Sequence, residues 1–307
     1  MATFYLDMYG GGNDANDGLT PATPKATLNA ATALVTAVTD EIRVRGVDSL
    51  FTSVGNATWT DKSNNVIMTG DTTASVAVGD YICKTIVASG TTMPILHLVA
   101  SRSYVAGTNL TTIVLTNTTN CYYYGTTETV DTSKISLAQT IALQDFGRNG
   151  QTSGTADSWN RVDTQITGGW NSGYTAQNSF TLCYNTANAS NYSVVNNNTA
   201  RRQYWHLKRF IVFNGNQYFD IYQAYCSFTD SVFIGLAARR QIIASPCYWL
   251  IFNNCYFYHA ATGYDVMVNI NNFFYFNNCH IQNTINRVSL LGNRMSVNNT
   301  IFAYGNS

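Results

Sequence analysis

The fold is decided by an eight-residue stretch that occurs twice with little change, Leu250-Ile-Phe-Asn-Asn-Cys-Tyr-Phe257 and Phe274-Tyr-Phe-Asn-Asn-Cys-His-Ile281. Apolar residues alternate with other residues on each side of the two asparagines. Alternation of period two predicts short strands, because successive side chains of a strand point to opposite faces. The stretch therefore predicts two strands that are joined by a tight corner and send alternate side chains to the same interior.

The pattern also recurs before and after these copies. The other copies, aligned without gaps, are Trp205-His-Leu-Lys-Arg-Phe-Ile-Val212, Cys226-Ser-Phe-Thr-Asp-Ser-Val-Phe233 and Met295-Ser-Val-Asn-Asn-Thr-Ile-Phe302, and successive copies start 21, 24, 24 and 21 residues apart. This period is too short for a propeller blade, and the pattern differs from that of leucine-rich repeats. It predicts that each copy is part of one coil of a parallel β-helix, with neighbouring coils about 4.8 Å apart.

Stacked coils place equivalent residues in columns. We expect two inward columns of apolar side chains and one polar column at the corner. The inward columns are Leu207, Phe228, Phe252, Phe276 and Val297, then Val212, Phe233, Phe257, Ile281 and Phe302; the corner column is Arg209, Asp230, Asn254, Asn278 and Asn299. Asparagine suits the corner because it tolerates left-handed backbone angles and its amide can bond to the copies above and below.

Two cysteines, Cys255 and Cys279, directly follow the corner in adjacent copies. A metal or redox site is one interpretation, and the packing of small residues behind the corner is the other, which we favour. The chain has seven cysteines and no CxxC pair, and the odd number leaves at least one thiol free. We therefore expect reduced, buried thiols, with no metal and no cofactor.

The composition points to an all-β protein. The 307 residues include 17 Lys and Arg against 17 Asp and Glu, and charged residues make up 11%, compared with roughly 25% in globular domains. A coiled coil or a charged disordered chain would need many more charges. The 34 Asn, 20 Tyr and 15 Phe residues are strand formers and turn formers.

The N-terminus carries a second signal. It reads Tyr5-Leu-Asp-Met-Tyr-Gly-Gly-Gly-Asn-Asp-Ala-Asn-Asp-Gly18, then Thr23-Pro-Lys-Ala-Thr-Leu28, a predicted helix that ends near Val38 and a predicted strand over residues 40–46. This order resembles the opening of pectate-lyase-like right-handed β-helix proteins, which is also common in phage tail-spike and tail-fibre-like virion proteins. The resemblance covers about 45 residues here and, through the repeat, roughly residues 205 to 302. It implies that the helix caps the first coil.

Asp14 and Asp17 of this opening resemble a calcium loop. Their spacing lacks the full set of calcium ligands. We favour the interpretation that they fix turns through hydrogen bonds from their side chains to the backbone.

The predicted fold is therefore a right-handed parallel β-helix of the pectin-lyase-like kind with an inserted small β-barrel or sandwich. Residues 1–50 form the N-terminal cap and first coil, residues 51–137 the inserted β-domain, and residues 138–307 further coils with projecting loops. The middle part is predicted to be an insertion because its alternating segments, such as residues 76–83 and 111–116, lack the period of 21 to 24 residues.

An enzyme has to be considered, because β-helices often host polysaccharide lyases and hydrolases. Glycoside hydrolysis needs two carboxylates across a groove. The catalytic candidates are Asp157, Asp163, Asp220 and Asp230, and no two acids of this region stand one coil apart. The four histidines are scattered, and His280 is expected on the surface. We therefore lean against catalysis.

Aromatic and basic residues bear on other possible partners. Trp159, Trp170 and Tyr174 in an aromatic-rich stretch are candidates for binding sugar rings. The basic residues Arg201, Arg202, Lys208, Arg209, Arg239 and Arg240 are too few for a nucleic-acid-binding domain. No apolar run reaches the 18 or so residues of a membrane span, and no signal peptide is recognisable. We expect neither nucleic acid nor membrane as a partner.

The expected function is that of a structural virion protein of a bacteriophage, made in the host cytoplasm. We expect a homotrimer that serves as a tail spike, tail fibre or baseplate component, or as a head spike that decorates the capsid, in contact with other virion proteins and host surface glycans. No segment after the last coil is long enough to cover its edge, which favours an assembly. The alternatives are a polysaccharide depolymerase and a non-catalytic glycan-binding module on the same fold.

Overall fold

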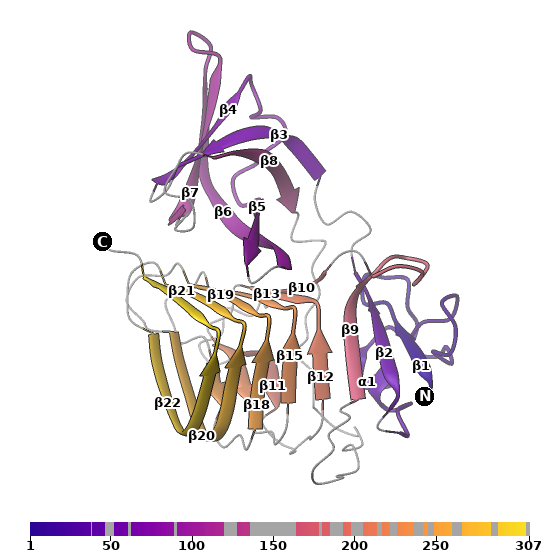
Figure 1. Ribbon diagram of the computed structural model, residues 1–307. Helices are drawn as coiled ribbons and strands as arrows, with labels where there is room; N and C mark the ends of the chain where they lie inside the picture. Colours follow the sequence, from indigo (N-terminus) through magenta and orange to yellow (C-terminus); the bar gives the residue numbers. More distant parts are fainter. Residues whose placement is uncertain are drawn as a thin grey trace.

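The protein is built almost wholly of strands, as the computed structural model shows (Figure 1). The structure describes residues 1–37, 39–46, 52–60, 63–88, 91–119, 128–135, 164–177, 180–184, 193–197, 205–213, 217–221, 226–235, 242–244, 249–259, 266–283 and 288–304. Within these ranges the one helix is α1 (Leu28–Thr32). The all-β prediction is confirmed. No helix in this part of the chain is long and apolar enough to cross a membrane.

The largest element is an 11-stranded sheet, which we call the long sheet. All of its strand pairs are parallel. Its order is β1 (Thr3–Leu6), β2 (Glu41–Arg45), β9 (Thr164–Trp170), β12 (Trp205–Lys208), β15 (Cys226–Thr229), β18 (Trp249–Asn253), β20 (Val266–Asn277), β17 (Ile242–Ala244), β14 (Gln217–Ile221) and β11 (Ser193–Asn197), with β22 (Val288–Asn298) beside β20. The sheet changes course within β20, where residues 268–270 pair with β17 and residues 273–277 pair with β18.

Six of the described strands form a second, parallel sheet. Their order is β10 (Thr181–Tyr184), β13 (Phe210–Phe213), β16 (Val232–Gly235), β19 (Tyr256–His259), β21 (His280–Asn283) and β23 (Ile301–Tyr304). Strands β13, β16, β19, β21 and β23 each follow a strand of the long sheet after a corner of one or two residues. Backbone φ angles at the five corner residues are positive: 62° at Arg209, 49° at Asp230, 51° at Asn254, 52° at Asn278 and 45° at Asn299.

The core lies between these sheets and is formed by stacked aromatic rings. Phe228, Phe252 and Phe276 occupy one column, with ring centroids 5.4 and 5.2 Å apart and nearly parallel planes. Phe233 stacks on Phe257 at 4.7 Å in the neighbouring column and meets Phe252 edge-on. Both columns pair as the alignment of the repeat places them, and each ring is at most 2% exposed. Burying such a ring stabilises the fold by roughly 1.5–3 kcal/mol.

The middle of the chain forms a closed barrel. Its strand order is β3 (Thr52–Trp59), β4 (Ser63–Thr69), β7 (Leu110–Thr119), β6 (Thr91–Val105), β5 (Tyr81–Ala88) and β8 (Glu128–Ile135). Apolar side chains such as Trp59, Val66 and Ile113 fill it. The barrel lies against the second sheet, where β6 meets β16 and the His97 ring meets Tyr258 at 5.6 Å (Figure 1).

This packing corrects the expectation for His280. The residue is 1% exposed instead of lying on the surface, and its ring stacks on Tyr256 with centroids 4.7 Å apart. Alternation along the strand does direct His280 away from the Phe core. The outer face of the second sheet is itself buried at neighbouring positions, including Ile211, Val232 and Tyr258. The repeat could not predict that further parts of the chain cover this face.

The helix is shorter than predicted. It begins after Thr27, whose hydroxyl oxygen accepts from the N–H of Ala30, and ends at Thr32 rather than near Val38. The chain then continues in tighter turns, with Leu34 donating to Ala31 and Val35 to Thr32. The β-branched residues in this stretch disfavour further helix. Leu28 and Ala31 still pack onto the core, so the helix covers the strand stack at β1.

Candidate functional site

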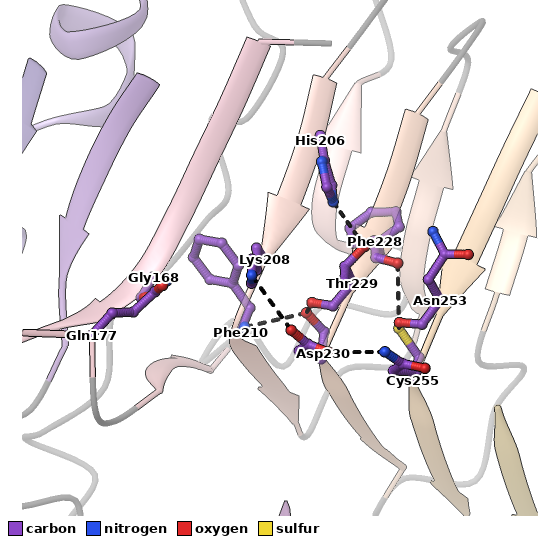
Figure 2. Close-up of polar contacts among 12 residues, drawn as sticks. Gly168, Gln177, His206, Lys208, Phe210, Phe228, Thr229, Asp230, Asn253 and Cys255 are labelled. Carbon is purple, nitrogen blue, oxygen red and sulfur yellow. Dashed lines mark hydrogen bonds and ion pairs between the residues drawn. The ribbon is translucent and has the colours of Figure 1, made fainter. Parts of the chain in front are cut away.

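Chemically versatile side chains gather at the corner between the long sheet and the second sheet (Figure 2). We call His206, Lys208, Thr229, Asp230 and Asn254 the corner cluster. The Lys208 Nζ atom lies 3.7 Å from Asp230 Oδ2, and the Asn254 amide donates to Asp230 Oδ1 at 3.3 Å. His206 Nε2 and Thr229 Oγ1 form a hydrogen bond of 2.8 Å. Side chains of three adjacent strands are therefore tied together across the stack.

The catalytic candidates are not brought together here. Both carboxylate oxygens of Asp230 are engaged. We call a strand of the long sheet, its corner and the strand that follows a rung. The residues equivalent to Asp230 in the neighbouring rungs are Arg209 and Asn254 rather than acids. Asp220 lies on β14, in register with Asn196 and Ile243, in a different part of the long sheet. Asp157, Asp163 and Trp159 lie outside the described residues.

The surroundings of His206 favour its neutral form. Burial lowers the pKa of His206, and the nearby Lys208 ammonium lowers it further, while Asp230 opposes both effects. A neutral imidazole can share one proton with the Thr229 hydroxyl. Burial also lowers the pKa of Arg209, whose guanidinium lies 4.6 Å from the centre of the Phe180 ring.

Two amide ladders follow the corner, one more than the sequence predicted. In the predicted ladder, the Asn299 amide donates to Asn278 Oδ1 at 2.8 Å. The additional ladder lies one residue earlier, where Asn277 donates to Asn253 Oδ1 at 2.8 Å and Asn298 donates to Asn277 Oδ1 at 2.9 Å. The doubled Asn in three successive copies was the available signal for it.

The two thiols behind the corner have a structural role that other residues share. Cys255 Sγ lies 3.3 Å from the carbonyl oxygen of Asn253, and Cys279 Sγ lies 3.4 Å from that of Asn277. At the same position of other rungs, the Ser231 and Thr300 hydroxyls donate to the equivalent carbonyls at 2.9 and 3.0 Å. Burial raises the pKa of the Cys255 thiol, so it stays protonated and can donate.

A second network, which the sequence did not suggest, links β2 and β9. The Trp170 indole N–H donates to the Thr167 hydroxyl at 2.9 Å, which donates to Glu41 Oε1 at 2.7 Å. Arg43 Nε donates to Glu41 Oε2 at 3.0 Å, and its guanidinium lies 4.1 Å from the Trp170 ring centre. This arrangement orients the one predicted sugar-binding tryptophan that the structure describes.

Tyr174 requires a correction. It was a candidate for binding sugar rings, but it is 4% exposed, and its hydroxyl donates to the Leu6 carbonyl at 2.8 Å. Its φ angle of 54° belongs to a turn that Asn171 closes by accepting from the Thr175 N–H. The turn directs the ring inward against Tyr5, and burial raises the pKa of the Tyr174 hydroxyl.

The acidic loop near the N-terminus is held by its own hydrogen bonds. The Asp14 carboxylate accepts from the N–H groups of Ala26 and Thr27 and from the Thr27 hydroxyl. Asp17 accepts from the Thr23 hydroxyl and the Leu19 N–H. These bonds fit the turn-fixing interpretation. Among the residues that the structure places, no group of three or more His, Cys, Asp or Glu could hold a metal ion.

Comparison with known proteins found no matching family model, no matching curated protein and no matching solved structure.

Proposed function

We propose that the chain is a right-handed parallel β-helix and serves as a structural protein on the surface of a bacteriophage particle. It would be a tail spike, tail fibre or baseplate component, or a head spike that decorates the capsid. The observation that carries this proposal is the use of polar side chains along the corner. Amides, thiols and hydroxyls at equivalent positions of successive rungs bond to one another or to the backbone. Such repetition stabilises a stack and favours a building element over a catalyst.

The proposed architecture also suits a mechanical role. In a solenoid, each repeat contacts only its neighbours, so stability rises with the number of stacked units. The Phe column through Phe228, Phe252 and Phe276 ties three rungs together by stacking. A rod of this kind can project from a particle. We propose a homotrimer, in which three rods support one another laterally.

The test is the protein content of purified virions. We expect mass spectrometry to detect the chain in density-purified particles, with a copy number that is a multiple of three. Light scattering of the isolated chain should give three times the mass of one chain. Absence of the chain from particles that are complete in their other proteins would reject the proposal.

A glycan contact is the second part of the proposal, and Trp170 is the residue that favours it. The ring is only partly buried, and the hydrogen bond to Thr167 and the contact with Arg43 fix its orientation. Host surface polysaccharide should bind the chain without being cleaved, and Trp170→Ala should weaken the binding. Tyr104→Ala on the barrel is the matched aromatic control. Release of oligosaccharides by the wild type would show the rival depolymerase instead.

A further inference from the structure

One group of polar and aromatic side chains lies on the outer face of the long sheet. It is carried by β2 and β9, which pair side by side near the N-terminal end of the stack (Figure 1). Ile42 and Ile166 point into the core, so their neighbours Arg43 and Thr167 face away from it. We call Glu41, Arg43, Thr167 and Trp170 the Arg43 group.

The guanidinium of Arg43 is held at one edge and open at the other. Its Nε atom donates to Glu41 Oε2 at 3.0 Å, and its central carbon lies 4.1 Å from the centre of the Trp170 ring. The Thr167 hydroxyl donates to the other oxygen of Glu41 at 2.7 Å and so fixes this carboxylate. Among the described residues, none bonds to the two terminal nitrogens of Arg43, and the side chain is 27% exposed. These nitrogens are therefore available to a ligand from solvent.

Two glycines and a shift in strand register bring Trp170 to Arg43. The pairing of β2 with β9 shifts register after Arg43, and such irregularities turn a side chain in a new direction. Gly169 has a φ angle of 78°, a conformation that favours glycine. A Cβ atom at Gly168 would lie 2.7 Å from the carbonyl oxygen of Arg209, so a larger residue does not fit there. The backbone therefore sets the position of the indole before any ligand arrives.

The open edge of Arg43 fits a planar, singly charged anion. A guanidinium donates two parallel hydrogen bonds to the oxygens of a carboxylate. The Glu41 carboxylate already balances the charge of Arg43, so one further negative charge is easier to accommodate than the nearly double charge of a phosphate group. The indole of Trp170 adds a large apolar surface beside the guanidinium, on which the C–H groups of a sugar ring can pack.

We propose that Arg43 and Trp170 form a binding subsite for a sugar unit that carries a carboxylate. The carboxylate would accept hydrogen bonds from both terminal nitrogens of Arg43, while the sugar ring would pack on the exposed part of the Trp170 indole. Glu41 and Thr167 would position Arg43 without touching the ligand. This inference rests on the proposed glycan contact and adds the chemical class of the glycan.

The experiment measures the affinity of the full chain for methyl β-D-glucuronide and methyl β-D-glucoside by ligand-detected NMR. The two sugars differ only in a carboxylate in place of a hydroxymethyl group. We expect the glucuronide to bind about tenfold more tightly, because hydrogen bonds to a charged group are strong. Arg43→Gln should abolish this preference. Arg102→Gln on β6 of the barrel is the matched control and should retain it, and thermal melting verifies that the variants are folded.

Salt provides a second measurement that needs no variant. Raising the ionic strength should bring the affinities for the two sugars closer together, because salt screens an ion pair that is open to solvent. A preference that salt leaves unchanged would overturn the contact between the carboxylate and Arg43.

The outcomes separate this inference from the proposed glycan contact. Equal affinities for both sugars, each lowered by Trp170→Ala, would keep the glycan contact and overturn the carboxylate. A preference for the glucuronide that persists in Arg43→Gln would overturn the assignment to Arg43. Failure of the glucuronide to bind the wild type, even where host polysaccharide binds, would overturn the inference as a whole.

Two further probes test the class of ligand. N-acetylglutamate amide carries a carboxylate without a sugar ring, and glucose-6-phosphate carries a phosphate on a sugar ring. Both should bind more weakly than the glucuronide. Binding of the first as tightly as the glucuronide would show that the sugar is not recognised, and tighter binding of the second would assign the subsite to phosphate; either result overturns the proposal.

Discussion

Truncating the ring at the centre of the Phe column should be among the most destabilising changes in the chain. Phe252 is fully buried, stacks on Phe228 and Phe276, and meets Phe233 and Phe257 edge-on. Phe→Ala in a core typically costs about 3–5 kcal/mol. Each aromatic pair contributes a further 0.5–1.5 kcal/mol or so. We therefore expect Phe252→Ala to lower the free energy of unfolding by about 4–5 kcal/mol. This is most of the stability of a marginal domain, since folded domains are stable by only about 5–15 kcal/mol in total.

The assay is urea unfolding followed by far-ultraviolet circular dichroism at a fixed protein concentration. The matched control is Val297→Ala, which shortens a side chain in the same column at a position that is 37% exposed. Val297→Ala should lower the free energy of unfolding by less than about 1 kcal/mol, because little apolar area leaves contact with the core. Similar losses for both variants would refute the assignment of Phe252 to the centre of a closed core.

A stronger form of the same test introduces a charge. Phe252→Asp would place a carboxylate among the rings of Phe228, Phe257 and Phe276, with no cation in the column. Burying an uncompensated charge costs more than a domain can usually bear. We expect no soluble, folded protein, and a well-folded Phe252→Asp chain would show that the register is wrong.

Three further predictions concern the corner and Asp40, which directly precedes β2. Asn278→Ala should lower the free energy of unfolding by about 1–2 kcal/mol more than Asn278→Gly, because the residue has a φ angle of 52° and only glycine adopts it freely; equal losses in urea unfolding would contradict this. Cys255→Ser should change the free energy of unfolding by less than about 1 kcal/mol, since a hydroxyl can donate to the Asn253 carbonyl as Ser231 and Thr300 donate to the equivalent carbonyls. Cys255→Val has no donor and should cost about 1–3 kcal/mol. A Val variant as stable as the Ser variant would refute the role of the donor. Burial alone would raise the pKa of Asp40, but hydrogen bonds from the N–H groups of Ala2, Ala37 and Thr36 lower the pKa overall. The contribution of the Asp40 carboxylate to the free energy of unfolding should therefore be constant above about pH 5. It should decline as the pH falls below the unfolded pKa of about 3.9. Asp40→Asn should flatten this acid decline in pH-dependent melting, and an unchanged decline would assign it to other groups.

The sequence predicted the parts of the fold that repeat. Stacking in parallel puts equivalent residues of successive copies side by side, so a gap-free alignment places Phe228 beside Phe252 and Asn278 beside Asn299 without further information. The left-handed corner could be predicted for the same reason, because Asp and Asn recur there.

Features that depend on contacts between distant segments could not be predicted in this way. His280 is buried on a face that the repeat shows only as pointing away from the core. Tyr174 is turned inward by a bond to Leu6, which is 168 residues away in the chain. Alternation gives the direction of a side chain, but not what lies against it. The helix α1 ends earlier than predicted for a local reason, because the β-branched residues that follow Thr32 disfavour helix.

The same physics separates structural from functional polar residues. A polar residue that recurs at one position of the rung, such as Asn253 and Asn277, is explained by its bond to the next copy. Chemistry adapted to a ligand has no reason to follow that period. Glu41, Arg43 and Trp170 form their network where the pairing of β2 with β9 changes register between Arg43 and Arg45, and none of the three recurs in the column. In this stack, the departure from the period is therefore the better guide to a contact surface than the density of polar residues.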